Sequence, residues 1–239
     1  DPDRIHATGS LKYDTLPREA DQRAVKRLRR KFSISGGQKV LVGGSPHPGE
    51  EEVLCDVYAG LREEIPSLRL IVAPRHVERA PAVERAIRGR NLPVVRKSHV
   101  DNSQDTADEG DVVLVDTIGD LVDCYALADC VFVGRSLVEP GGGQNMMEPA
   151  ALGKPVLVGP HTGNFRPEMR YLRRREAVRV VSGAGELAAA CGELLKEPER
   201  AGELGERARR AVQQSRGATR TTLRHLERML EQAAPGDGK

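Results

Sequence analysis

Residues 141–160, GGGQNMMEPAALGKPVLVGP, predict more about this chain than any other segment of it. Three glycines lead into a short helical pattern with Asn145 and Glu148 one turn apart, and the apolar run PVLV follows Gly153 at once. Glycines let a backbone approach a ligand closely, and the N–H groups of a helix N-terminus suit phosphate. A carboxylate one turn further on can accept hydrogen bonds from two sugar hydroxyls. The segment therefore predicts a nucleotide or nucleotide-sugar site on an α/β sheet.

Short apolar, β-branched runs alternate with amphipathic patterns on both sides of this segment. The predicted strands are 39–43, 68–73, 92–96, 111–116, 130–134, 155–159 and 178–182. The predicted helices are 17–31, 48–64, 76–89, 119–128, 145–153, 165–174, 184–196, 198–213 and 217–233. Regular alternation predicts a doubly wound, Rossmann-like parallel sheet. Several strands are apolar on both faces, as a sheet covered by helices on both sides requires.

The chain begins abruptly with DPDRIHATGS, which predicts a fragment of a longer protein. We expect a linker segment at 1–16, a Rossmann-like nucleotide-sugar-binding domain at 17–215, and a C-terminal helix with a tail at 216–239. That helix carries an apolar stripe. Its members are Leu223, Leu226, Met229 and Leu230. Composition alone favours packing of the stripe on this domain, with a partner surface as the alternative.

Composition excludes several classes of function. Aromatic residues are 3% of the chain and there is no Trp, which leaves no stacking platform for single-stranded nucleic acid. The 37 basic and 35 acidic residues nearly cancel, which argues against a general polyanion binder. No apolar run is long enough to span a bilayer. The four cysteines lack CxxC or zinc spacing and are expected to be buried, reduced thiols. They are Cys55, Cys124, Cys130 and Cys191.

The carboxyl ends of the strands in an open parallel sheet are where ligands bind. After the first strand, Gly43–Ser45 predicts either a contact to phosphate or a tight turn in which Ser45 caps the next helix. After the second strand, Arg75 follows Pro74 and can bind phosphate or carboxylate bidentately. His76 next to it either binds a sugar or caps the following helix.

The fourth strand is followed by Asp116–Asp120, where Gly119 sits at a predicted helix start. The amides of Ile118 to Asp120 can meet a base or phosphate there, and the alternative is an ordinary helix capped by Thr117. The absence of GxGxxG after the first strand and of GxxxxGK[ST] anywhere disfavours an NAD site and a P-loop. Apart from Asp1-Pro2-Asp3 at the start of the sequence there is no DxD. The polar stretch 101–111, predicted to be a mobile loop, lacks the ligand spacing of a metal site.

At these residues the chain resembles a known family, the 3-deoxy-D-manno-octulosonic acid (Kdo) transferases, and specifically their carboxyl-terminal half. The resemblance covers nearly the whole chain, and its motifs come in the family order. They are TGSLKYD (8–14), GGSPHPGEEE (43–52), APRHVER (73–79), VDTIGDL (115–121) and FVGRSLVEPGGGQNMMEPAALGKPVLVGPHTGNF (132–165). The resemblance implies an inverting glycosyltransferase of GT-B architecture, acting in lipopolysaccharide synthesis.

By resemblance, this half binds the donor CMP-Kdo without a metal ion or other cofactor. Glu148 matches the residue on the ribose hydroxyls, and Lys12 matches a lysine that stabilises developing negative charge. Physical chemistry agrees, because arginine and helix N-termini can neutralise a monophosphate leaving group. The predicted donor-site residues are Ser45, Pro74, Arg75, His76, Thr117, Ile118, Gly119, Asp120, Gly142, Gly143, Asn145, Met146, Met147 and Glu148.

The chain departs from the family pattern at three positions beside the predicted donor site. Arg135 stands where Gly is usual, Gln144 where His is usual, and Met146 where Pro is common. These departures leave the identity of the donor open. Arg135 either adds a charge contact to the sugar acid or points to solvent.

The resemblance also implies what the amino-terminal half supplies. That half carries the general base, the site for the lipid A precursor and the membrane-anchoring segment. The closing helices of GT-B enzymes often cross back to it, so the resemblance favours a C-terminal helix on which Leu226 and Met229 face that half. We therefore expect the full-length enzyme at the cytoplasmic side of the bacterial inner membrane, and the isolated chain to bind donor without transferring it. Two alternatives stay open: a GT-B transferase or epimerase that uses a UDP-sugar, and a non-enzymatic nucleotide-binding module.

Overall fold

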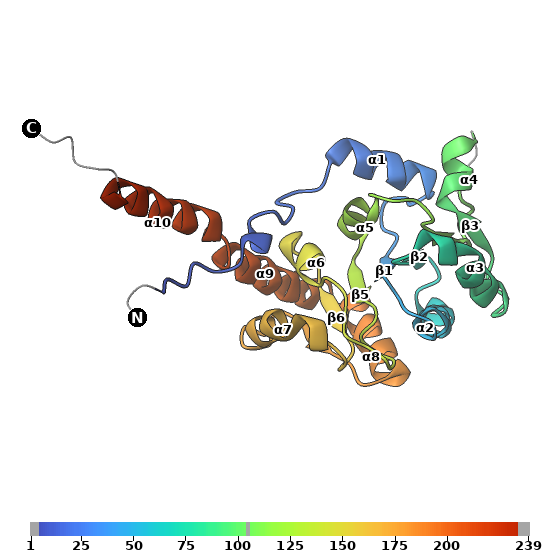
Figure 1. The fold of residues 1–239 in the computed structure, drawn as a ribbon. Helices are drawn as coiled ribbons and strands as arrows, with labels where there is room; N and C mark the ends of the chain where they lie inside the picture. Colours follow the sequence, from blue (N-terminus) through green and yellow to red (C-terminus); the bar gives the residue numbers. More distant parts are fainter. Residues whose placement is uncertain (1–4, 104–105, 234–239) are drawn as a thin grey trace, which may run out of the picture.

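The computed structural model describes residues 5–103 and 106–233. In this part of the chain, seven strands form one parallel sheet in the order β3-β4-β2-β1-β5-β6-β7 (Figure 1). The strands are β1 Val40–Gly44, β2 Arg69–Ala73, β3 Val94–Arg96, β4 Val112–Leu114, β5 Cys130–Val133, β6 Val156–Val158 and β7 Arg179–Val180. Each lies within or one residue beyond a predicted strand, so the predicted parallel sheet is confirmed.

Helices join successive strands and cover both faces of the sheet. They are α1 Gln22–Lys31, α2 Glu50–Glu64, α3 Ala80–Arg88, α4 Lys97–Asn102, α5 Leu121–Leu127, α6 Met147–Ala151, α7 Arg166–Arg173, α8 Ala184–Lys196, α9 Pro198–Gln214 and α10 Ala218–Ala233. Short 3-10 helices in the described part of the chain are η2 Leu11–Tyr13, η3 Val77–Arg79 and η4 Gly163–Phe165.

Three helices differ from prediction for local reasons. Helix α1 begins at Gln22 instead of 17 because Asp21 caps it, accepting a hydrogen bond from the N–H of Arg23 at 2.8 Å. Helix α6 shrinks to five residues because the side chain of Asn145 accepts the N–H of Met147. Helix α4 was not predicted, since six residues with two buried side chains show no apolar stripe. It includes the first two residues of the predicted loop 101–111, of which 104–105 lie outside the described residues.

The core consists of two apolar clusters, one on each face of the sheet. Strand residues alternate between them: Val40 and Val42 belong to the cluster under α1, α5, α6 and α7, whereas Leu41 belongs to the cluster under α2, α3 and α8. This alternation explains why the strands are apolar throughout. All four cysteines are buried and unpaired, as predicted. Burial raises the pKa of the Cys55 thiol to about 12, so it stays protonated.

The register of the central strands brings their carboxyl ends to one edge. Gly44 of β1 pairs with Ala73 of β2 on one side and with Val133 of β5 on the other. The chain leaves β1 towards β2 through α2 and reaches β5 through α5, on the opposite face. The ends of β1 and β5 therefore form a topological switch point, where α/β folds bind ligands.

A buried carboxylate ties the two loops at this switch point together. Glu50, the first residue of α2, is fully buried. Its Oε2 accepts the N–H of His47 at 2.7 Å and of Arg135 at 2.5 Å, and its Oε1 accepts those of Ser136 at 2.8 Å and Leu137 at 2.7 Å. One side chain thus satisfies four backbone donors that would otherwise be buried without partners.

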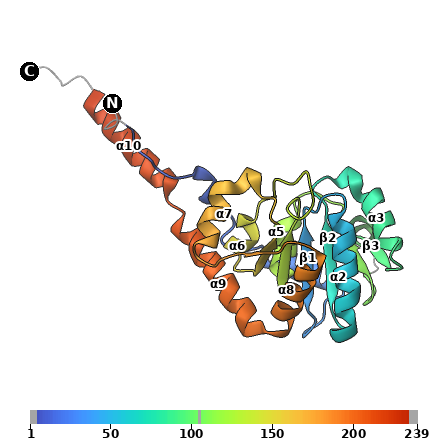
Figure 2. The same cartoon turned by 90° about the horizontal axis from the view of Figure 1, so that it is seen from below.

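The amino-terminal segment and α10 project together from the domain (Figures 1 and 2). Asp14 accepts the N–H groups of Gly217 and Thr219 at 2.6 and 2.7 Å, which lowers the pKa of Asp14 to about 2. The four residues of the apolar stripe on α10 are 49–71% exposed, so the prediction that they pack on this domain is wrong. Residues 1–4 and 234–239 of the predicted terminal segments lie outside the described residues.

Replacing Glu50 by Gln is expected to lower the free energy of unfolding by about 2–5 kcal/mol. The amide oxygen of the glutamine can accept only some of the four backbone N–H groups. Its NH2 group would face the others, and two donors cannot form a hydrogen bond with each other. Urea unfolding monitored by circular dichroism measures the loss.

Glu52→Gln is the matched control, because Glu52 accepts the single N–H of Gly49 at 3.0 Å near the surface. It is expected to cost less than about 1 kcal/mol. An equal effect of the two substitutions would show that the carboxylate of Glu50 does not hold the loops.

Candidate functional site

A pocket of about 100 Å³ lies at the carboxyl ends of β1, β2 and β4. It gathers residues from three separate loops after these strands. Those predicted from the sequence are Ser45, Pro74, Arg75, Thr117, Ile118 and Gly119, and the others are Ala73, Val77, Val115 and Leu121. We call it the strand-end pocket. Six predicted site residues that are far apart in the sequence therefore line one cavity.

The backbone of the pocket is held in conformations that suit tight turns. Ser45 has a left-handed backbone with φ of 53°, and its N–H donates to the carbonyl of Ala73 at 2.7 Å. Ser45 caps no helix, since the N-cap residue of α2 is Gly49. Gly43 and Gly44 serve packing instead of a ligand, because a Cβ on them would meet Leu54 at 2.4 Å and Tyr125 at 2.1 Å.

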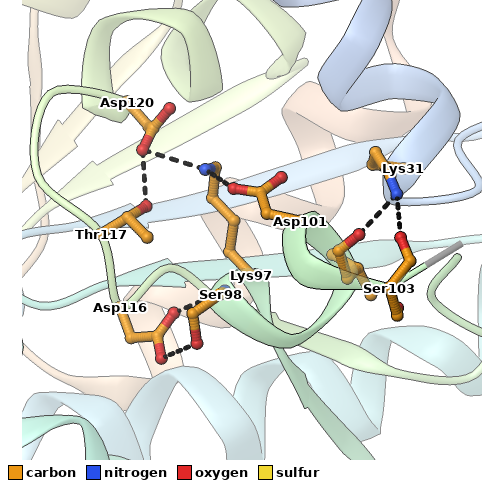
Figure 3. Close-up of polar contacts among 9 residues, drawn as sticks. Lys31, Lys97, Ser98, Asp101, Ser103, Asp116, Thr117 and Asp120 are labelled. Atoms are coloured by element: carbon orange, nitrogen blue, oxygen red, sulfur yellow. Dashed lines mark hydrogen bonds and ion pairs between the residues drawn. The ribbon is translucent and has the colours of Figure 1, made fainter. Parts of the chain in front are cut away.

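The loop 116–120 is anchored from below by α4 (Figure 3). Asp116 accepts hydrogen bonds from the N–H and the hydroxyl of Ser98 at 2.9 and 2.6 Å. Lys97 is almost fully buried and forms ion pairs with Asp101 and, at 3.1 Å, with Asp120. Thr117 also donates to Asp120, at 2.5 Å. The predicted helix cap by Thr117 is therefore wrong, and Asp120 faces Lys97 instead of lining the pocket.

Asn145 and Glu148 lie together beside Arg75. The Asn145 amide donates to Glu148 Oε1 at 2.9 Å, and its oxygen accepts from Met147 N–H at 3.1 Å. Burial raises the pKa of Glu148, while the hydrogen bond from Asn145 and the charge of Arg75 oppose that rise. The charge of Arg75, which lines the strand-end pocket, reaches this carboxylate. This is an arrangement that suits a polyol next to a phosphate.

The glycine-rich turn 141–143 is built by its own backbone bonds. Gly142 donates to the carbonyl of His161 at 2.9 Å, and Gly143 donates to that of Arg135 at 2.6 Å. Both glycines have positive φ, 122° and 81°. The N–H groups of these two glycines are thus engaged within the protein, and they shape the turn without offering free donors. The side chain of Arg135 lies against the same turn, with Nε donating to the carbonyl of Gly141 at 3.1 Å.

Several predicted site residues have side chains that do not line the strand-end pocket. The side chains of Met146 and Met147 are buried in the core. His76 is exposed, lines no part of the pocket and makes no helix-capping bond; its Nδ1 is 3.4 Å from Glu78. Lys12 is exposed on η2, and no contact described for residues 5–103 and 106–233 joins it to the pocket.

Sequence reasoning missed two residues that support the site. Glu50 begins the acidic run EEE, which reads as an ordinary helix start. Lys97 lies in a polar stretch where a solvated lysine is the default expectation. Within the described residues no group of three or more His, Cys, Asp or Glu side chains could hold a metal ion, and no helix there is long and apolar enough to cross a bilayer. Independence of metal stays a prediction.

No protein-family model matches the chain. The fold is similar to that of a glycosyltransferase from Rickettsia africae, with a TM-score of 0.62 and 15% identity, covering 95% of this chain and 57% of that one. This likeness shows the class of fold, a doubly wound α/β domain of the GT-B type.

Closer relatives specify the family. A 3-deoxy-D-manno-octulosonic acid transferase of Haemophilus influenzae is 31% identical over 96% of this chain and 52% of its own length. The crystal structure of the C-terminal CMP-Kdo binding domain of WaaA from Acinetobacter baumannii matches with a TM-score of 0.73 and 30% identity, covering 80% of this chain and 97% of that domain. The chain therefore belongs to the Kdo transferase family. The chain spans about half or less of the length of these curated relatives.

Replacing Glu148 by Gln is expected to stabilise the free chain at neutral pH. Because burial raises the pKa of Glu148, the folded chain holds this proton more tightly than the unfolded chain. The stability that the protonated group contributes at low pH is lost as pH rises through the raised pKa. The introduced glutamine cannot ionise, so the variant should be more stable than the parent at about pH 8 and similar to it at about pH 4.

Urea unfolding of both proteins across this pH range measures the difference. Glu63→Gln, an exposed glutamate on α2, is the control and should leave the curve of stability against pH close to that of the parent. A Glu148→Gln variant that is less stable than the parent at neutral pH would contradict the assignment.

Proposed function

We propose that this chain binds CMP-Kdo as the donor half of an inverting Kdo transferase. The observation that carries the proposal is the strand-end pocket, where Arg75 from the β2 loop lies within electrostatic reach of Glu148 from α6. Glu148 and Asn145 would hold the ribose hydroxyls, and Arg75 would bind the phosphate. The backbone of Ile118 and Gly119 would meet the nucleotide.

In the proposed reaction, the bond between the sugar and the phosphate oxygen breaks and CMP leaves with an added negative charge. Arg75 would stabilise that charge through charge-assisted hydrogen bonds that strengthen as the charge develops. Lys12 is proposed as a second cation for this step. Lys12 lies on η2 beside α10, outside the strand-end pocket. For this role, either η2 would have to move towards the donor or the donor would have to reach η2.

The transfer itself is proposed to need the remainder of a full-length enzyme. That remainder would supply the general base, the lipid A precursor site and the attachment to the cytoplasmic side of the inner membrane. Division of the chain into 1–16, 17–215 and 216–239 belongs to the same proposal. The exposed stripe on α10 is compatible with a role between the two halves.

Calorimetry with CMP, UMP and UDP tests the proposed donor. We expect CMP to bind more tightly than the uridine nucleotides. Arg75→Ala and Glu148→Ala should each weaken CMP binding about 10- to 100-fold, because each removes a hydrogen bond that involves a charged group. Arg85→Ala, an exposed arginine on α3, is the matched control and should bind as the parent does.

Three other results would contradict the proposal. Preference for UDP would favour a transferase or epimerase that uses a UDP-sugar, and no nucleotide binding would favour an interaction module. Equal binding by the parent and the Arg75 and Glu148 variants would place the nucleotide elsewhere.

A further inference from the structure

A second hollow, of about 570 Å³, lies beside the glycine-rich turn and shares no lining residue with the strand-end pocket. Its walls are the segment Glu139–Gly142, the segment Pro160–Gly163 that follows β6, and Arg166 at the start of α7. We call it the turn pocket. The strand-end pocket is lined by loops that follow β1, β2 and β4, and the turn pocket by loops that follow β5 and β6. Since β5 pairs with β1 in a parallel sheet, these loops leave the same edge of the sheet.

The walls of the turn pocket are rigidly joined. Gly142 donates to the carbonyl of His161 at 2.9 Å, and the N–H of Asn164 donates back to the carbonyl of Gly142 at 2.9 Å. A Cβ on Gly141 would lie 2.1 Å from that of His161. Only a glycine permits this close approach. The hollow is thus preformed, which lowers the entropic cost of binding a small ligand.

The charges around the turn pocket favour an anion. Arg166 is exposed, and its guanidinium has no hydrogen-bond or ion-pair partner among residues 5–103 and 106–233. The one carboxylate in the wall, Glu139, is 81% exposed and lies 3.8 Å from Nδ1 of His161. Arg135 adds a second positive charge behind the turn through its bond to Gly141.

The backbone of Arg135 has an unfavourable conformation. Its φ of 54° is left-handed, a conformation that costs a residue with a side chain free energy and that glycine adopts freely. Strain of this kind clusters at functional sites. The side chain lies on the turn and does not point away to solvent, so its charge contributes to the potential at the turn pocket.

We infer that the turn pocket holds the sugar acid of the donor, with its carboxylate paired to Arg166. This inference rests on the proposed function, since a sugar linked to the nucleotide phosphate must lie next to the nucleotide. The guanidinium of Arg166 can bind a carboxylate bidentately. The volume lies within the range of small-molecule sites. A neutral nucleotide sugar would leave this cation without a partner.

Comparison of CMP with freshly prepared CMP-Kdo, by calorimetry on the whole chain, tests the inference. Arg166→Ala is expected to weaken CMP-Kdo binding about 10- to 100-fold and to leave CMP binding within about twofold of the parent. Arg166→Lys should recover part of the loss, because the charge is kept without the bidentate geometry. Arg170→Ala is the matched control: it removes an exposed arginine one turn along α7, outside the turn pocket.

The possible failures are distinguishable. If Arg166→Ala binds CMP-Kdo as the parent does, the carboxylate is held elsewhere and the inference is wrong. If Arg166→Ala weakens CMP and CMP-Kdo equally, Arg166 serves the nucleotide or the fold, and the inference is again wrong. If the parent chain does not bind CMP at all, the proposed function fails first and the sugar-acid subsite fails with it.

Discussion

The carboxylate of Glu50 is the interaction on which the arrangement of the site depends. It accepts four backbone N–H groups, one from the loop after β1 and three from the loop after β5. An ionised carboxylate is stable in a fully buried position only when donors satisfy it. In this protein the donors are backbone N–H groups of two loops, so the hydrogen bonds to Glu50 also fix these loops relative to each other. Gly134 completes the junction, because a Cβ there would lie 2.3 Å from Pro46.

Several unfavourable features lie at the same edge of the sheet. Ser45 and Arg135 both have left-handed backbones, and burial disfavours the charged form of Glu148. Elsewhere in the molecule the strands are apolar and tightly packed, and that core supplies the stability which these features reduce. A partly desolvated carboxylate within electrostatic reach of an arginine lowers the stability of the free protein and is typical of functional sites.

Most of the fold was predictable from the sequence because its signals are local and repeated. Each strand is a β-branched run between turn residues, and each long helix has an apolar face. The errors fall where local signals are weak. The short helix α4 buries only Lys97 and Val100, and the start of α6 depends on one hydrogen bond from Asn145. The stripe on α10 looks like a core face, yet the described part of the chain offers it no cover.

The residue types around the site could be read without coordinates, because polar and glycine-rich segments follow the strands and strand ends of a parallel sheet converge. Sequence alone thus identified Arg75, the 117–119 loop, Asn145 and Glu148. Three-dimensional packing was needed to separate side chains that line a pocket from those that hold it in place. Asp120 pairs with buried Lys97, Met146 fills the core, and Glu50 joins two loops. Such roles arise from contacts between segments that are distant in the chain. The spacing of residues within one segment therefore cannot predict them.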